Sequence, residues 1–252
     1  NSDKTWAKVY CVDYLGWIPT RNIMKVTKEE FLSNRKLEFA TYINRQKNID
    51  GYTIDMGTRM PIVSEDSSRF KLAMPLAGEF YKTTTIDLDK SELVKSYLAF
   101  SQANIIKQAL KFEGEKYGWG HSNNTRDCSG FIRDIYRSFG IIIPRDAGQQ
   151  AKDIVGKNIY FSPYTTRASK EGFLLKQKPG ICMYMQGHVM MYLGRDGNFR
   201  PNMIHQYGYA FVNGKKTGVF RNEINDVAKL VTSSSAFIDY VTSGRDFTSL
   251  SN

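Results

Sequence analysis

The sequence predicts an α+β protein in which a region of short strands precedes a larger domain. Three observations lead to this prediction. Up to about residue 90, short strand-like segments alternate with Gly- and Pro-containing turns. Apolar residues then recur at helical spacing, and from about residue 180 they alternate again as in strands. Helices followed by antiparallel strands are typical of an α+β domain.

The first region consists of short strands with close spacing, which favours one or more small β-barrels. The segments are broken by turn residues, among them Gly and Pro. The predicted strand segments are residues 6–19, 37–44, 51–63, 69–75 and 78–86.

Two helical segments follow. From Asp89 the pattern changes, and residues 91–118 carry apolar residues among polar ones as an amphipathic helix does. We place a domain boundary at this change. A second helix begins at or just before Cys128, with one apolar face, and ends at Gly140.

The pattern of residues in the last part of the chain predicts antiparallel strands. Residues 180–186 and 187–194 are separated by Gly187, and residues 202–212 follow a turn at 195–198. The dipeptide Asn213-Gly214 is typical of a tight hairpin turn into residues 217–221.

Composition limits the class of protein. The chain has 252 residues, 41% of them hydrophobic and 24% charged, which is typical of a folded globular protein. No apolar run approaches the roughly 18 residues that span a bilayer, so we expect no transmembrane segment. The chain starts at Asn1 without a Met or an apolar leader, so we expect that any export signal has been removed or lies upstream.

The formal net charge of +10 favours polyanionic partners such as nucleic acid, anionic lipid or an acidic wall polymer. There is no zinc-finger spacing and no long Lys/Arg block, so we expect no nucleic-acid binding. The segment 214–217 lacks the glycine that a phosphate-binding loop requires.

Three cysteines are present, and none forms a CxxC pair. Cys11 and Cys182 lie in strand-like segments, where we expect small buried hydrophobic side chains. Cys128 differs because a helix start places a partial positive charge beside it, which can lower a thiol pKa from about 8.5 to roughly 3.5–7.5. The unpaired N–H groups of that first turn could also hold an oxyanion.

A thiol nucleophile needs a general base, and imidazole is the usual one. The chain has three histidines. If the turn after residue 194 is symmetric about Asp196-Gly197, His188 and His205 lie directly opposite each other, and the second ring could orient the first. The alternatives are structural strand histidines or a Cys/His/His zinc site, which lacks the usual ligand spacing. We expect His121 to lie in a solvated loop.

The residues around Cys128, His188 and His205 resemble those of a known family. The segments "KYGWGHSNNTRDCSGFIRDIYRSFGIIIPRDAGQQ", "GHVMMYLG" and "IHQYG" resemble the NlpC/p60 family of cysteine peptidases over about residues 97–245. The family implies a papain-like catalytic domain. In addition, "GWIPTRNI" and "IDMGTRMPI" resemble bacterial SH3-like (SH3b) barrels. We therefore expect the end of a first barrel, apparently truncated, at residues 1–25, a second barrel at 26–90 and the catalytic domain at 91–252.

The resemblance implies roles for individual residues. Cys128 corresponds to the nucleophile, His188 to the general base and acid, and His205 to the residue that orients it. Tyr117 corresponds to a tyrosine that lines the site. The four substrate-binding positions implied are Tyr117, Asp127, Ser129 and Asp146.

Asp146 corresponds to the carboxylate that meets the free amine of an N-terminal L-alanine, which would favour peptides released from glycan. Helix capping is the alternative reading for Asp127, Ser129 and Asp146, and for Asp127 and Ser129 it is compatible with substrate binding.

The resemblance also implies an activity. It predicts hydrolysis of the bond between γ-D-glutamate and a diamino acid, such as diaminopimelate, in peptidoglycan stem peptides, without a metal or organic cofactor. A related amidase or acyltransferase, or a catalytically silent wall-binding protein, is the alternative. We expect a location in the cell envelope, with a cytoplasmic recycling role as the second possibility.

Overall fold

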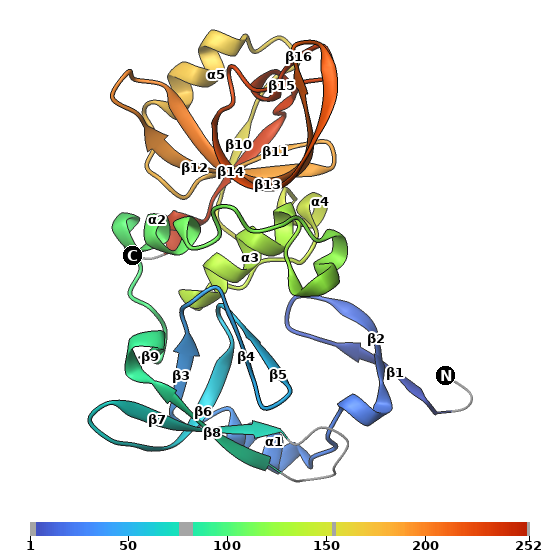
Figure 1. The fold of residues 1–252 in the computed structure, drawn as a ribbon, viewed down its shortest axis with the longest axis vertical. Helices are drawn as coiled ribbons and strands as arrows, with labels where there is room; N and C mark the ends of the chain where they lie inside the picture. Colours follow the sequence, from blue (N-terminus) through green and yellow to red (C-terminus); the bar gives the residue numbers. More distant parts are fainter. Residues whose placement is uncertain (1–3, 76–82, 153–154, 251–252) are drawn as a thin grey trace. The chain divides into compact units, whose positions relative to one another are not determined.

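A computed structural model describes residues 4–75, 83–152 and 155–250. The chain divides into two compact units (Figure 1). Unit 1 comprises Asn1–Leu98 and Arg137–Ile142, and unit 2 comprises Ala99–Tyr136 and Ile143–Asn252. The predicted module boundaries at residues 25 and 90 stay a prediction.

Unit 1 begins with a β-hairpin of β1 (Trp6–Tyr10) and β2 (Leu15–Pro19). Cys11 lies in the turn, where its N–H donates to the Tyr14 carbonyl at 2.8 Å. The prediction that Cys11 is buried is wrong, because its side chain is exposed in this turn. The strand-like segment 6–19 is therefore two strands and a turn, and the thiol lies outside both.

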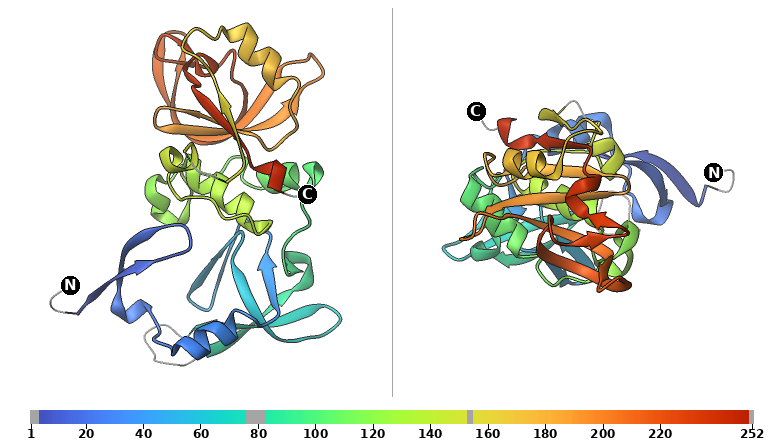
Figure 2. Two further views of the ribbon diagram at one scale, coloured as in Figure 1. Left: turned by 180° about the vertical axis from the view of Figure 1, so that it is seen from behind. Right: turned by 90° about the horizontal axis from the view of Figure 1, so that it is seen from above.

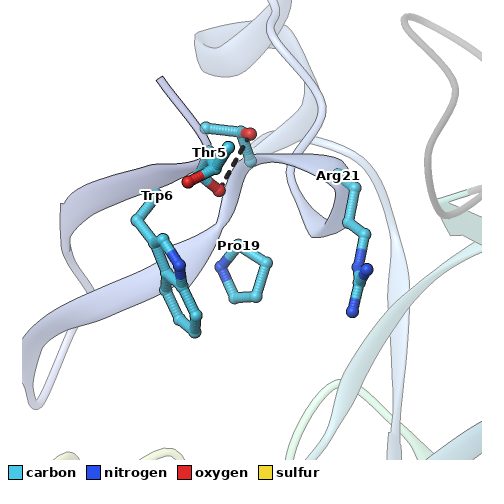
Figure 3. A pocket seen from close by; sticks show the side chains of 5 residues that line it. Thr5, Trp6, Pro19 and Arg21 are labelled. Atoms are coloured by element: carbon cyan, nitrogen blue, oxygen red, sulfur yellow. Dashed lines mark hydrogen bonds between the residues drawn. The ribbon is translucent and has the colours of Figure 1, made fainter. Parts of the chain in front are cut away.

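The hairpin ends beside a small pocket lined by Thr5, Trp6, Pro19, Thr20 and Arg21 (Figure 3). The Thr20 hydroxyl donates to the Thr5 carbonyl at 3.1 Å, which joins the start of β1 to the short helix η1 (Thr20–Asn22). Trp6 is 46% exposed. The hairpin therefore presents aromatic surface to solvent as well as a pocket.

Helix α1 (Lys28–Asn34) was not anticipated from the strand pattern. Thr27 and Glu30 form a reciprocal capping box at its start, in which each side chain accepts from the backbone N–H of the other. A Thr followed three residues later by Glu is the sequence signal that could have located this helix.

The main sheet of unit 1 has five antiparallel strands in the order β8-β7-β6-β3-β9. A separate hairpin, β4–β5, packs Ile54 into the same apolar core as Leu72 and Ile86. The strands are β3 (Phe39–Tyr42), β4 (Gln46–Ile49), β5 (Tyr52–Asp55), β6 (Arg59–Glu65), β7 (Arg69–Pro75), β8 (Thr83–Asp89) and β9 (Leu93–Lys95), with the short helix η2 (Lys90–Glu92) before β9.

The prediction of one helix over residues 91–118 is wrong at its start. Leu93 pairs with Tyr42 in the sheet, and its side chain is buried in the core of unit 1. Helix α2 covers only Gln102–Leu110, and it begins at Ser101, whose side chain accepts the Asn104 N–H. Part of the predicted strand 78–86 lies outside the described residues.

The helices of unit 2 position the candidate nucleophile. Helix α3 begins at Cys128, as predicted, and the chain turns at Gly140, whose φ of +77° is a left-handed conformation that favours glycine. Helix α4 is only four residues long. These helices are η3 (Trp119–Asn124), α3 (Cys128–Ser138), α4 (Ala147–Gln150) and α5 (Arg167–Leu174).

The strands of unit 2 form an eight-stranded sheet in the order β10-β17-β11-β12-β13-β15-β16, with β14 paired to β13. Its strands are β10 (Lys157–Tyr160), β11 (Cys182–Met185), β12 (His188–Arg195), β13 (Pro201–Val212), β14 (Lys215–Asp226), β15 (Val231–Thr232), β16 (Ser235–Ala236) and β17 (Ser243–Asp246). The predicted hairpin turn is confirmed, since Asn213 and Gly214 both have positive φ between β13 and β14.

Helices α2, α3 and α4 lie on one side of this curled sheet and α5 on the other (Figures 1 and 2). Met190, Tyr192, Met203 and Tyr207 point into a common core with Leu174 of α5. Two short helices, η4 (Phe237–Tyr240) and η5 (Phe247–Leu250), complete the chain. The α+β prediction agrees with this mixture of helices and antiparallel strands.

None of the helices in the described ranges is both long and apolar enough to cross a membrane.

Candidate active site

Cys128 is the first residue of α3 and is 6% exposed. Its sulfur accepts hydrogen bonds from the backbone N–H groups of Ser129 and Val189. Val189 directly follows His188 in β12. The start of α3 and the start of β12 are therefore in direct contact, which brings the thiol beside the strand that carries His188.

The prediction of a lowered thiol pKa is not supported. Burial raises the pKa of Cys128 to about 11, and the negative charge of Asp127 acts in the same direction. The two N–H groups favour the thiolate, but desolvation outweighs them. The resting group is therefore a thiol rather than a thiolate.

His188 and His205 meet through a hydrogen bond of 2.8 Å between His188 Nε2 and His205 Nδ1. The predicted contact of the two rings therefore exists, and it leaves His188 Nδ1 as the other ring nitrogen for chemistry. Desolvation lowers the pKa of His188 to about 4 and that of His205 well below its usual range. Both imidazoles are neutral near pH 7.

The strand register that brings the rings together differs from the symmetric one. Met191 pairs with Ile204, which is two residues away from the predicted pairing, and a bulge follows Tyr192. Extended to the start of β12, this register places His188 opposite Tyr207, and His205 becomes a diagonal neighbour on the same face. The prediction that His188 and His205 are directly opposed is wrong, but both side chains still lie on one face.

Aromatic rings enclose the histidine pair. Tyr207 stacks on His205 with ring centroids 4.3 Å apart, and Phe237 of η4 contacts both imidazoles edge-on at 5.9 and 5.4 Å. Lys170 donates to the carbonyls of Ile238 at 3.2 Å and Val241 at 2.7 Å, which stabilises the short helix that carries Phe237. These contacts explain the desolvation of the rings.

Tyr117 lies at the candidate site, where its N–H donates to the Phe220 carbonyl at 2.7 Å. Burial raises the pKa of Tyr117 to about 12, and its coupling to Cys128 and to the Asp127 carboxylate acts in the same direction. Its hydroxyl is therefore a neutral hydrogen-bond donor near the thiol.

Asp127 and Ser129 are held in an internal network. Asp127 Oδ1 accepts the Gly130 N–H at 2.8 Å, and its Oδ2 accepts from Arg145 at 2.8 Å. The Ser129 hydroxyl donates to Asp127 and accepts from Arg145 at 3.1 Å. Asp127 thus caps α3, which was the alternative reading, and the Gly130 N–H is not available to an oxyanion. Burial acts to raise the pKa of Asp127, but the hydrogen bonds from Arg145 and the backbone hold it below its usual value.

Asp146 is exposed at the residue before α4, and its side chain makes no capping hydrogen bond there. The alternative reading of Asp146 as a helix cap is therefore not supported. The Asp146 carboxylate lies near enough to Arg145 to act, after Asp127, in raising the pKa of that guanidinium against the effect of burial. His121 is half-buried in η3 with a positive φ of 70°.

Among the described residues, no group of three or more His, Cys, Asp and Glu is arranged to hold a metal ion. The Cys/His/His zinc alternative therefore finds no support in the geometry. The arrangement offers a thiol, a neutral imidazole and a second imidazole that is hydrogen-bonded to the first.

Comparison with known proteins agrees with this geometry. The model of the NlpC/P60 family matches residues 114–219, which include Cys128, His188 and His205. This part of the chain is an NlpC/P60 domain. The predicted family is therefore confirmed for the domain that carries the site.

Relatives of the NlpC/P60 domain are named as peptidases. The chain is 29% identical to a gamma-D-glutamyl-L-lysine dipeptidyl-peptidase from Bacillus cereus, over 76% of this chain and 56% of the relative. It is 28% identical to an enzyme of the same name from Bacillus subtilis, over 58% of this chain and 47% of the relative. The chain spans about half the length of the curated relatives it matches.

A solved structure of an NlpC/P60 endopeptidase from Photobacterium damselae subsp. piscicida shares the fold. Its TM-score is 0.75 at 20% identity, and the alignment covers 98% of this chain and 62% of that one. The likeness therefore extends beyond residues 114–219 into the N-terminal region.

Sequence reasoning missed a buried ionic network beneath the NlpC/P60 site. Arg126 is fully buried, and it donates to Glu115 at 2.8 Å and to Asp134 of α3 at 2.9 Å. Gln206, the neighbour of His205, donates to the other Glu115 oxygen at 2.8 Å. The network therefore connects the segment before Cys128 to the strand that carries His205. The signal in the sequence was a charged residue, Arg126, two positions before Cys128.

Replacing Arg126 with Met should lower the free energy of unfolding by about 3–5 kcal/mol, because it leaves the Glu115 and Asp134 carboxylates buried without their cation. Urea unfolding monitored by circular dichroism measures this loss. Lys107→Met, on the exposed face of α2, is the matched control and should change stability by less than about 0.5 kcal/mol. Equal effects of the two variants would contradict the role of the network.

The neutral histidines make stability depend on pH. Below about pH 6.5 the unfolded chain binds protons that folded His188 and His205 do not, so the folded state loses stability as pH falls from about 6.5 towards 4. Each such histidine contributes a slope of at most about 1.4 kcal/mol per pH unit. Urea unfolding at pH 7, 5.5 and 4.5 should show a smaller slope for His205→Gln. An unchanged slope would show that His205 is not held neutral.

Proposed function

We propose that this chain is a cysteine peptidase that hydrolyses the bond between γ-D-glutamate and a diamino acid in peptidoglycan stem peptides. The observation that carries the proposal is the contact between the start of α3 and β12, which places the Cys128 sulfur on the Val189 N–H beside His188. The relatives named gamma-D-glutamyl-L-lysine dipeptidyl-peptidase support the bond type.

The proposed chemistry follows from the neutral resting state of Cys128 and His188. As the Cys128 sulfur attacks the γ-carbonyl carbon, its proton passes to His188 Nδ1, and the C–O double bond opens to an oxyanion. The Cys128 N–H at the start of α3 is suited to stabilise this oxyanion, because Asp127 occupies the Gly130 N–H. His188 then protonates the leaving amine, and the C–N bond breaks to leave a thioester. Water, deprotonated by His188, releases the acid.

His205 has a supporting part in this scheme. Its bond to His188 Nε2 fixes the ring so that Nδ1 faces the reacting atoms. The aromatic contacts of Tyr207 and Phe237 hold both rings out of solvent. The positions of the two rings are therefore set before a substrate covers Cys128.

Asp146 is the proposed selectivity group. An exposed carboxylate without a capping hydrogen bond can form a charge-assisted hydrogen bond with the ammonium of an N-terminal L-alanine. A stem peptide that is still attached to glycan through this nitrogen has no such charge. We therefore propose that the enzyme prefers free stem peptides.

We also propose that the protein works in the cell envelope. The proposal is supported by the nature of its substrate and by the net charge of +10, which suits a surface in contact with acidic wall polymers. We further propose that the N-terminal strands are SH3-like modules, as their sequence resemblance implies.

Cys128→Ala should reduce hydrolysis of L-Ala-γ-D-Glu-diaminopimelate and L-Ala-γ-D-Glu-L-Lys by about 10³-fold or more, because no other group can form the thioester. Chromatography of the released diamino acid measures the rate, and the ratio of the two rates gives the preferred diamino acid. Cys11→Ala removes an exposed thiol and should leave the rate unchanged. Full activity of Cys128→Ala would refute the proposal, and an inactive wild-type chain would favour a silent wall-binding protein.

Asp146→Asn should lower the preference for a free over an N-acetylated alanine terminus about ten- to hundredfold, as expected for the loss of one charge-assisted hydrogen bond. The ratio of kcat/KM for the two peptides measures this preference. Asp50→Asn, at an exposed turn of unit 1, is the matched control and should leave the ratio as in the wild type. The same ratio in Asp146→Asn would exclude Asp146 as the selectivity group.

A further inference from the structure

The hydrogen bonds of the histidine pair continue beyond His205. Asn225 Nδ2 lies 3.4 Å from His205 Nε2 and donates to the Tyr207 hydroxyl oxygen at 3.2 Å. Tyr207 in turn donates to Glu223 at 2.6 Å, and Arg221 donates to the other oxygen of Glu223 at 2.6 Å. A continuous chain of polar groups thus runs from His188 to a surface ion pair.

The strand register explains why these groups meet. His205 pairs with Glu223, Tyr207 with Arg221 and Met203 with Asn225 across β13 and β14, so all of these side chains share one face. Asn225 is therefore diagonal to His205, as His205 is to His188. Asn225 lies outside the residues matched by the family model.

The ion pair of Glu223 and Arg221 fixes which groups donate and which accept at the surface end of this series of hydrogen bonds. Burial acts to raise the pKa of Glu223, but the hydrogen bonds from Tyr207 and Arg221 hold it below its usual range, so Glu223 is a carboxylate that can only accept. Tyr207 must donate its hydroxyl hydrogen to Glu223. Its oxygen is then left as an acceptor, and Asn225 turns its Nδ2 donor towards it.

This direction has a consequence at the histidines. Because Asn225 Nδ2 is a donor, His205 Nε2 is an acceptor, and the His205 proton resides on Nδ1. His205 Nδ1–H then donates to His188 Nε2, so the His188 proton resides on Nδ1. In this arrangement His188 Nδ1 cannot accept the thiol proton.

The reverse direction gives a base that can act. If the Asn225 amide turns by half a rotation, its Oδ1 accepts the His205 Nε2–H, His205 Nδ1 accepts the His188 Nε2–H, and His188 Nδ1 is free to accept a proton. We propose that Asn225 is a positioning residue whose amide orientation sets which ring nitrogens of His205 and His188 carry the protons. This inference rests on the proposed function for its catalytic meaning.

The other groups that face His205 do not set this polarity. Phe237 of η4 offers only an aromatic edge, and Tyr207 presents its ring face to the imidazole. The charged groups at the outer end are Glu223 and Arg221, and both act on His205 through Tyr207 and Asn225. Asn225 is the group that touches His205 Nε2 and can present either a donor or an acceptor.

The first test reads the tautomer directly, by ¹⁵N NMR of the full chain labelled at histidine. The three histidines can be assigned with His121→Gln and His205→Gln. We expect wild-type His205 to be protonated mainly on Nδ1 at pH 7. In Asn225→Asp, whose carboxylate only accepts, the proton should move to Nε2. Tyr207→Phe keeps the stacked ring but removes the hydroxyl oxygen that accepts from the Asn225 amide, so the fraction of His205 protonated on Nε2 should rise.

The second test measures the pH dependence of kcat/KM on the stem peptide. Asn225→Asp should raise kcat/KM about threefold or more, because its carboxylate holds His205 in the tautomer that leaves His188 Nδ1 free, and it should move the acid limb to higher pH, because a carboxylate stabilises the imidazolium. Asn225→Leu, which can neither donate nor accept, should lower kcat/KM about ten- to hundredfold. Asn202→Asp is the matched control, since Asn202 bonds to the Arg200 carbonyl, and it should leave the pH profile unchanged.

The same His205 tautomer in wild type, Asn225→Asp and Tyr207→Phe would overturn the proposal. A chain that shows the tautomer shift but hydrolyses no stem peptide would instead refute the proposed function, because the NMR measurement needs no substrate.

Discussion

The geometry of the site depends on one buried cation. Arg126 has no access to water, so its charge is stabilised by the two carboxylates and the aromatic ring that surround it, Glu115, Asp134 and Phe112. These partners come from the segment after α2 and from α3, and Gln206 extends the network to β13. Because a buried ionic network permits few alternative arrangements, it fixes the start of α3 against the strand that carries His205.

Desolvation is the second constraint, and it raises the pKa of the Cys128 thiol while it lowers that of the His188 imidazole. It disfavours the thiolate of Cys128 and the imidazolium of His188, so the resting pair is neutral. The helix dipole favours a thiolate, but its partial charge competes with burial and with the adjacent Asp127. Because both imidazoles are neutral, the direction of the hydrogen bond between His188 and His205 decides which nitrogen of His188 is unprotonated. In the proposed mechanism this nitrogen must be Nδ1, since only an unprotonated nitrogen can accept the thiol proton.

Much of this could be predicted from the sequence. The contact of the two histidines was predicted from a symmetric register, and it forms in a different register because both side chains lie on one face of the sheet. The helix start at Cys128 and the Asn213-Gly214 turn followed from local patterns. The β12–β13 register did not, because the bulge after Tyr192 shifts the pairing without changing the alternation of side chains. Leu93 was misassigned because its apolar spacing fits a helix, and only the sheet formed with Tyr42 decides its conformation.

The segment after residue 219 shows why a family pattern alone does not complete the site. Phe237 reaches the imidazoles from η4, and Lys170 holds that helix by bonding to its carbonyls. Asn225 reaches His205 from β14 through the strand register. None of these residues is marked by motif or spacing, since each acts through a contact that forms only when the sheet curls. The proposed nucleophile and base can be located from the sequence, whereas the groups that contact the imidazole pair and are proposed to set its protonation can be located only in the fold.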